Sequence, residues 1–300
     1  MNLDFIYRGE TQDLNPGTRK EAAGGVFVEL PNGHTHYELG GPVSSSTGRE
    51  AVVAFVHGFS VPYFIWDSAF EFFSGAGFRV LRYDLFGRGF SDRPRVSYNL
   101  DLFVRQLEDL LDALKLARVN LIGLSMGGAI ASAFTARLPE RVRKLALIAP
   151  IGTEPMPLSW MYQAAFLPGV SELILGLAGT DNMVKAVASD FFDPAHVEIF
   201  QEKYKVQMQY RGFKRAILST LRNKTIAGFP EVYEKLGKLD LPVLLVWGRN
   251  DRTLPLEQSQ PILELIPRAE FHVIENCGHI PHYEKSGEVN PILLKFLSQS

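Results

Sequence analysis

Val119-Asn120-Leu121-Ile122 is followed at once by Gly123-Leu124-Ser125-Met126-Gly127, and then by residues 128–134, whose small and apolar side chains have helical spacing. A strand that turns sharply into a helix is the setting in which the G-x-S-x-G pattern exposes its serine hydroxyl. The flanking glycines are needed because a Cβ at either position would collide with the neighbouring strand or helix. The stretch predicts an α/β fold in which Ser125 is a candidate nucleophile.

Short apolar runs alternate with helical patterns on both sides of this turn. The runs that predict strands are 26–30, 34–39, 51–56, 79–83, 142–149, 242–247 and 269–274. Such alternation predicts a mostly parallel sheet with helices on both faces, entered by antiparallel strands. It stops over residues 152–232, an interval too long for a bare connection in a compact domain. We therefore expect an N-terminal arm over 1–24, a core of 25–151 and 233–300, and an inserted helical lid over 152–232.

The composition limits the classes of function. With 31 basic and 33 acidic residues, the net charge of −2 gives no electrostatic footprint for nucleic acid. No apolar run approaches the roughly 20 residues of a membrane span, and the N-terminus lacks a signal-peptide pattern. The single cysteine, Cys277, is compatible with a reducing compartment. We expect a cytoplasmic protein with a small-molecule substrate, and leave a homo-oligomer open.

A serine nucleophile needs a base, and the base needs a carboxylate that orients it. In elbow enzymes the acid and then the histidine follow the serine along the chain. Here the run 242–247 is followed by Gly248-Arg249-Asn250-Asp251, and the run 269–274 by Glu275-Asn276-Cys277-Gly278-His279. Both side chains lie just beyond predicted strands, where active sites of open α/β sheets form. We predict a Ser125–His279–Asp251 triad.

Other residues compete for these roles. His282 is close to His279 in the chain, but it begins the predicted last helix. Asp84 also ends a predicted strand, but it precedes the serine and is better interpreted as a turn-stabilising residue. We expect His57 to hydrogen-bond within its own turn and Cys277 to be a small packed residue.

The negative charge that develops on the substrate oxygen needs preorganised donors. The backbone N–H of Met126 directly follows the nucleophile at the start of a helix. A second donor is expected from His57-Gly58-Phe59, just after the run 51–56, with the N–H of Phe59 as the natural choice. Ser60 follows without an elbow of its own.

Together these segments resemble the α/β-hydrolase superfamily, in its branch of serine hydrolases of carboxylesterase or lipase type with a helical cap. The segments are His57-Gly58-Phe59, the stretch 84–92, Gly123-Leu124-Ser125-Met126-Gly127-Gly128, Trp247-Gly248-Arg249-Asn250-Asp251 and Cys277-Gly278-His279. The resemblance runs from about residue 26 to the C-terminus and omits the lid. It implies an eight-stranded sheet, a cap after the sixth strand, and no metal or organic cofactor. The serine departs from haloalkane dehalogenases and epoxide hydrolases, which have aspartate in the elbow.

The inserted lid is rich in large apolar side chains, and we expect it to roof an apolar acyl or aryl pocket. The predicted pocket residues are Ser60 and Phe64 from the core and Trp160, Tyr162, Phe166 and Arg211 from the lid. Each apolar one has the alternative of packing the lid onto the core. Arg211 and Arg215 have the alternative of a solvated helix face.

We expect a hydrolase of carboxylic esters with short or medium acyl chains, monoacylglycerol-like esters included, that acts through an acyl-enzyme on Ser125. The alternative is a carbon–carbon bond hydrolase of ring-fission diketones, which would use the same triad. It would need a cationic lid residue, Arg211 or Arg215, for the substrate carboxylate. Cofactor-free perhydrolase chemistry is a less favoured third hypothesis. A non-catalytic receptor would not need all three triad positions filled.

Overall fold

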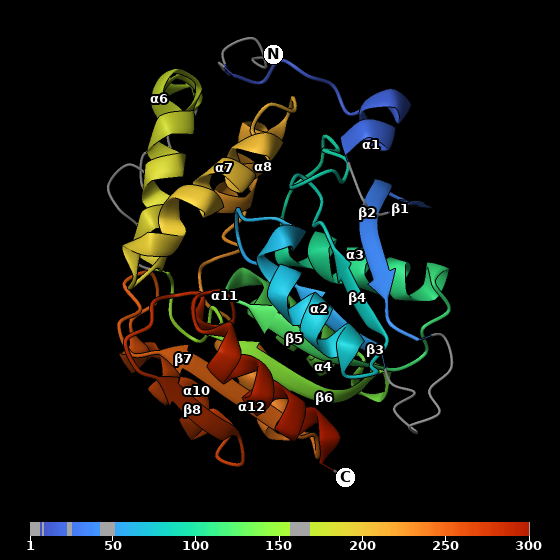
Figure 1. Ribbon diagram of the computed structural model, residues 1–300, viewed down its shortest axis with the longest axis vertical. Helices are drawn as coiled ribbons and strands as arrows, with labels where there is room; N and C mark the ends of the chain where they lie inside the picture. The colour runs from blue at the N-terminus through green and yellow to red at the C-terminus, as the bar shows by residue number, and fades with distance from the viewer. Residues whose placement is uncertain (1–6, 8, 23–25, 43–51, 157–168, 300) are drawn as a thin grey trace.

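An eight-stranded sheet forms the centre of the computed structural model, which describes residues 7, 9–22, 26–42, 52–156 and 169–299 (Figure 1). The strands are β1 (Val26–Leu30), β2 (Gly33–Gly40), β3 (Val52–Val56), β4 (Val80–Tyr83), β5 (Val119–Leu124), β6 (Val142–Ile148), β7 (Val243–Gly248) and β8 (Glu270–Ile274). Their order is β1-β2-β4-β3-β5-β6-β7-β8. The pairs β1–β2 and β2–β4 are antiparallel and the others are parallel. The predicted α/β-hydrolase fold is confirmed.

Helices cover both faces of this sheet. They include α2 (Asp67–Gly75), α3 (Leu100–Ala113), α4 (Met126–Arg137), α9 (Pro230–Gly237), α10 (Ser259–Leu265), α11 (Pro281–Glu284) and α12 (Ser286–Ser298). α2 packs against α12, whereas α4 packs against α3 and α9, and α9 against α10. Every residue of β3, β5 and β7 is buried as a result. Such strands have continuous apolar sequences because neither face meets water.

In the part of the chain that the structure describes, three further helices follow β6 and form a cap. They are α6 (Val170–Ala186), α7 (Val197–Gln207) and α8 (Phe213–Arg222), joined in part by the 3-10 turns η5 (Val187–Asp190) and η6 (Pro194–His196). Figure 1 shows them together at one end of the molecule, away from α12. They contact the loop after β3 through Gln207 and Ser60, so they lie over the carboxyl ends of the strands.

The N-terminal arm joins this cap. The backbone N–H of Gln12 donates to the carbonyl of Gln209 at 2.9 Å, and the N–H of Arg211 donates to the carbonyl of Gln12 at 2.9 Å. The helix α1 (Pro16–Ala22) of the arm contributes Arg19, which is ion-paired with Asp92 of the core. The arm thus runs between cap and core.

The remaining short elements are the 3-10 turns η2 (Tyr63–Trp66), η3 (Pro139–Arg141) and η7 (Leu256–Gln258). Among the helices of the described ranges, none combines the length and the apolar character that a membrane crossing requires. In the same ranges, no group of histidine, cysteine and acidic side chains is arranged to hold a metal ion.

Candidate active site

Ser125 occupies a strained turn between β5 and α4. Its backbone has φ 54° and ψ −119°, a region that residues with a side chain avoid at a cost of about 1–3 kcal/mol. The close packing explains both glycines of the motif. A Cβ on Gly123 would lie 2.4 Å from the carbonyl oxygen of Gly127, and one on Gly127 would lie 2.2 Å from that of Val56. The N–H of Ser125 donates to the carbonyl of Ile148 at 3.0 Å, which ties the turn to β6.

Asp251 and His279 meet beyond the ends of β7 and β8. The Nδ1 atom of His279 lies 2.7 Å from Oδ2 of Asp251. The other oxygen, Oδ1, accepts the backbone N–H groups of Thr253 and Leu254, each at 2.8 Å. Since the carboxylate is fixed from both sides, it holds the proton of the imidazole on Nδ1 and leaves Nε2 available as a base.

Two opposing effects set the pKa of His279. Burial lowers it, but the negative charge and hydrogen bond of Asp251, with a smaller contribution from Asp190, raise it, and the net pKa lies above that of a free histidine. A raised pKa strengthens the imidazole as a base towards a serine hydroxyl.

Asp190, at the end of η5, is a carboxyl group that the sequence did not indicate. Its carbonyl accepts the N–H of His279 at 2.7 Å, and its Oδ1 accepts the hydroxyl of Thr253 at 2.6 Å. Burial raises the pKa of this carboxyl, and the nearby charge of His279 only partly offsets that. No motif surrounds Asp190 in the chain, so only the tertiary contact of the cap with the loop of His279 identifies it.

One cavity of about 270 Å³ brings the predicted chemistry together. Ser125, His279, Phe59 and Ser60 all line it. The rest of its wall is mainly apolar and comes from core and cap: Val61, Ile65, Leu124, Met156, Met183, Val187, Tyr204 and Ile280. Such a pocket suits an apolar chain or ring next to one reactive carbonyl.

The predicted oxyanion donors flank the serine. Met126 is the first residue of α4 and is fully buried. Phe59 lies in the loop after β3, and a Cβ on the preceding Gly58 would lie 3.5 Å from the Cβ of Ser125. The two backbone amides therefore belong to the two segments that adjoin the nucleophile.

Two predicted pocket residues lie elsewhere. Arg211 pairs with Asp13 of the arm at 2.7 Å, with both side chains half exposed, so it contacts the arm and not the cavity. Phe64 points into the packing between core and cap, where its ring centre lies 5.3 Å from that of Phe200. Neither side chain is among the described residues that line the cavity of Ser125: Arg211, just before α8, pairs with the arm, and Phe64 of η2 packs against α7.

The other lid predictions, Trp160, Tyr162 and Phe166, lie outside the described residues. Arg215, the second candidate cation, donates to the carbonyls of Arg93 and Pro94 at 2.7 and 3.1 Å. Among the described residues that line the cavity, Arg252 is the arginine that could meet a substrate carboxylate. It is exposed, directly follows Asp251, and also lines a neighbouring groove with Phe191 and Phe192.

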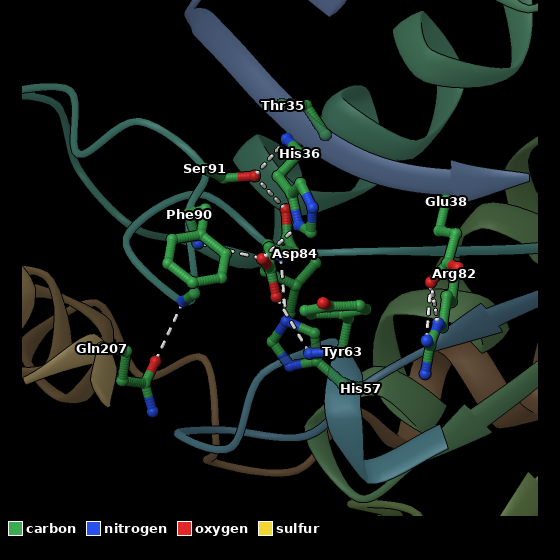
Figure 2. Close-up of polar contacts among 12 residues, drawn as sticks. Thr35, His36, Glu38, His57, Tyr63, Arg82, Asp84, Phe90, Ser91 and Gln207 are labelled. Atoms are coloured by element: carbon green, nitrogen blue, oxygen red, sulfur yellow. Dashed lines mark hydrogen bonds and ion pairs between the residues drawn. The ribbon is translucent and has the colours of Figure 1, made fainter. Parts of the chain in front are cut away.

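His57 and Asp84 form a buried network beside the site (Figure 2). Nε2 of His57 accepts the N–H of Leu85 at 2.9 Å, and its Nδ1 lies 2.9 Å from the carbonyl oxygen of Gly58. Burial lowers the pKa of His57 to about 4, so the ring is neutral near pH 7. Asp84 binds Nδ1 of His36 at 2.8 Å and the N–H of Tyr63 at 2.9 Å. Both side chains organise backbone, in agreement with their structural interpretation.

Two other competitors are also buried. Burial raises the pKa of the Cys277 thiol far above its usual range, with Glu284 adding to the effect. That thiol is therefore a poor nucleophile. His282, one residue inside α11, is 1% exposed and its ring centre lies 4.1 Å from that of Trp66.

Comparison with known proteins agrees with this architecture. The model of the alpha/beta hydrolase family matches residues 53–292, so the chain belongs to that family. A 2-hydroxy-6-oxononadienedioate/2-hydroxy-6-oxononatrienedioate hydrolase of Paraburkholderia phymatum is 31% identical over 94% of this chain and 98% of its own. A 2-hydroxymuconate semialdehyde hydrolase of a Pseudomonas species is 29% identical over 74% of this chain and 77% of its own.

Solved structures give the same picture. A meta-cleavage product hydrolase from Pseudomonas fluorescens has a TM-score of 0.72 and 25% identity, and covers 91% of this chain and 97% of its own. The chain is therefore a hydrolase. The carboxylic-ester activity expected as the main interpretation of the sequence is wrong, because these relatives are named for ring-fission products and not for esters. The elbow and triad could not reveal this, since both chemistries use them.

Proposed function

We propose that the chain hydrolyses a carbon–carbon bond of a 2-hydroxy-6-oxo dienoate, the class of compound for which its relatives are named. The observation that carries the proposal is one cavity that holds Ser125 in its strained turn beside the His279–Asp251 pair, in a chain related over nearly its full length to such hydrolases. The reaction then needs a nucleophile, donors for an oxyanion and a leaving carbon.

Ser125 attacks the C6 ketone while Nε2 of His279 takes the hydroxyl proton. The backbone N–H groups of Phe59 and Met126 receive the negative charge that develops on the ketone oxygen. Asp251 holds the imidazole through Nδ1, at 2.7 Å, and stabilises its protonated form.

The leaving group follows from the chemistry of the substrate. Before the attack, the substrate tautomerises: the C2 hydroxyl loses its proton and becomes a ketone, a proton is added at C5, and the double bonds shift to C3=C4. The C5–C6 bond of the serine adduct can then break, with its electron pair delocalised through C3–C4 onto the C2 oxygen. His279 returns its proton to that enolate. Water, deprotonated by His279, then releases the C6 acid from Ser125. One water is consumed, and a carboxylic acid and a 2-hydroxydienoate leave.

Arg252 is the residue we assign to the substrate carboxylate. It lines the described part of the cavity, and its side chain has no hydrogen-bond or ion-pair partner among the described residues. A guanidinium matches the two oxygens of a carboxylate. We thus assign to Arg252 the binding of the substrate carboxylate, a role for which the sequence suggested Arg211 or Arg215.

The first test is turnover of a 2-hydroxy-6-oxo dienoate, followed by loss of absorbance of its conjugated system. Ser125→Ala should lower kcat on the order of 10⁴-fold, as loss of a triad nucleophile does. Ser97→Ala, at an exposed serine outside the cavity, is the control and should change kcat by less than about tenfold. Faster turnover of a nitrophenyl ester of similar size by the wild-type chain would overturn the proposal.

The second test concerns Arg252→Met. Loss of a charge-assisted bond worth about 1.5–3 kcal/mol should raise KM for the dienoate about 10- to 100-fold and leave kcat nearly unchanged. Arg249→Met is the control, because Arg249 is exposed on the same loop but pairs with Glu275 at 2.8 Å. Equal effects of the two substitutions on KM would exclude Arg252 as the carboxylate site.

A further inference from the structure

Three successive carbonyl groups in the loop after β3 are each held by a side chain. We call residues 57–60 the oxyanion loop. The acceptor–donor pairs are Gly58 O with His57 Nδ1 at 2.9 Å, Phe59 O with Arg88 Nε at 2.8 Å, and Ser60 O with Gln207 Nε2 at 2.7 Å. A peptide group is planar and trans, so a fixed carbonyl also fixes the N–H on its opposite side. The Gly58 carbonyl, held by His57, lies in the same peptide group as the Phe59 N–H, and the two peptide groups that follow are held by Arg88 and Gln207.

Two of the three donors tie the oxyanion loop to the cap. Gln207 is the last residue of α7 and is 2% exposed. Its Oε1 also accepts the N–H of Gly89 at 3.0 Å, a contact visible in Figure 2. Arg88, fully buried, donates through Nη2 to the hydroxyl of Thr220 on α8 at 2.8 Å.

Gln207 contacts two separate loops of the core. One amide group bridges the carbonyl of Ser60, beside the proposed oxyanion donor, and the amide of Gly89, in the turn that follows β4. Removal of such a buried amide leaves its hydrogen-bond partners unsatisfied. The partners then either move to find other contacts or lower the free energy of unfolding by about 1–3 kcal/mol. Gln207 thus connects α7 to the oxyanion loop and to the turn after β4 at once.

We propose that Gln207 is a positioning residue through which the docked cap sets the geometry of the oxyanion hole. When α7 is seated on the core, Gln207 fixes the Ser60 peptide, and Arg88 with Thr220 fixes the Phe59 peptide. With the two following peptide groups held in this way, the Gly58–Phe59 peptide, which His57 holds through the Gly58 carbonyl, keeps its N–H aimed at the reacting oxygen. The proposal rests on acyl chemistry at Ser125 and deepens the proposed function. It does not depend on which acyl compound is cleaved.

The experiment separates binding of the tetrahedral state from binding of the ground state. Phenylboronic acid forms a tetrahedral adduct with a serine nucleophile and places an oxygen in the oxyanion hole, whereas benzoate binds without such an adduct. For Gln207→Leu we expect the inhibition constant of phenylboronic acid to rise about 10- to 100-fold, with a parallel fall in kcat, and the constant of benzoate to change less than about threefold.

Gln201→Leu is the matched control. Gln201 lies on the same helix, and its Nε2 donates to the carbonyl of Val184 within the cap at 2.7 Å. The same substitution there should disturb the cap without changing the ratio of the two inhibition constants. Gln207→Glu is the second variant. It keeps an acceptor for Gly89 but loses the donor to Ser60, and we expect the same loss of boronate affinity.

Unfolding midpoints of all variants show whether each is folded at the assay temperature, and Gln207→Glu replaces Gln207→Leu if the latter is not. Equal changes for boronate and benzoate, or an equal change in the Gln201→Leu control, would overturn the proposal. The inhibition constants do not require a ring-fission substrate. Failure of the wild-type chain to cleave a dienoate would therefore contradict the proposed function and leave this inference standing.

Discussion

At the scale of single residues, His282 shows how burial of an imidazole near His279, the proposed catalytic base, affects stability. Burial, with a smaller contribution from the charge of His279, lowers the pKa of His282 to about 3. In the unfolded chain the same group has a pKa near 6.5. Below about pH 6.5 the unfolded state therefore binds a proton at His282, whereas in the folded state His282 stays neutral until the pH approaches about 3. Stability is complete above that pH and falls as the pH drops towards 3.

We predict that His282→Phe makes the fold less sensitive to acid. Between pH 6 and 4.5, the wild-type chain should lose about 1.4 kcal/mol per pH unit through this residue, and the variant should not. A phenyl ring keeps the contact with Trp66. The measurement is urea unfolding at several pH values. The control is His196→Phe, a partly exposed histidine of η6. An unchanged slope for His282→Phe would show that the buried imidazole is not the source of the acid sensitivity.

At the scale of elements, the start of α8 depends on a residue of the N-terminal arm. Oε2 of Glu10 accepts the N–H of Gly212 at 2.6 Å, and its Oε1 accepts the N–H of Lys214 at 2.7 Å. Glu10 is 7% exposed, and burial raises its pKa although both hydrogen bonds lower it. A distant carboxylate thus satisfies two of the amides that the first turn of a helix leaves unpaired.

We predict that Glu10→Ala lowers the free energy of unfolding by about 1–3 kcal/mol, because two buried N–H groups lose their acceptor. Asp13→Ala is the control. It removes the exposed pair with Arg211 and should cost less than about 1 kcal/mol. Both are measured by chemical denaturation. A smaller loss for Glu10→Ala than for Asp13→Ala would contradict the capping role.

The elements also mark the limit of prediction from sequence. Asp251 and His279 could be located at strand ends because chain order and sheet topology are local and regular. The contacts that the cap makes with the rest of the molecule are neither local in the chain nor regular. Arg211 has helical spacing with other basic residues, but only the docking of the arm decides that it meets Asp13. Asp190 and Gln207 reach the site through contacts across 89 and 147 positions of the chain, which one sequence does not encode in any motif.

At the scale of the whole molecule, the fold could be predicted because alternation of strand and helix fixes the layers. The substrate could not be predicted, because proteins of one fold act on different substrates. The cavity beside Ser125 is walled by core loops and cap together, and the arginine among its described lining residues, Arg252, belongs to the core loop after β7 and not to the cap. Ester and carbon–carbon cleavage would both use the proposed triad of Ser125, His279 and Asp251, so the choice between them depends on the shape and charge around these residues.

Because Cys277 is buried, a label attached to an introduced cysteine would not react with the native thiol. It is the single cysteine of the sequence, it is 0% exposed, and its thiol resists ionisation. A cysteine introduced at Ile199, which is 65% exposed on α7, would be the one readily labelled thiol. A fluorophore or spin label at that position would record movements of the cap helix in solution without removal of any native side chain that touches the catalytic groups.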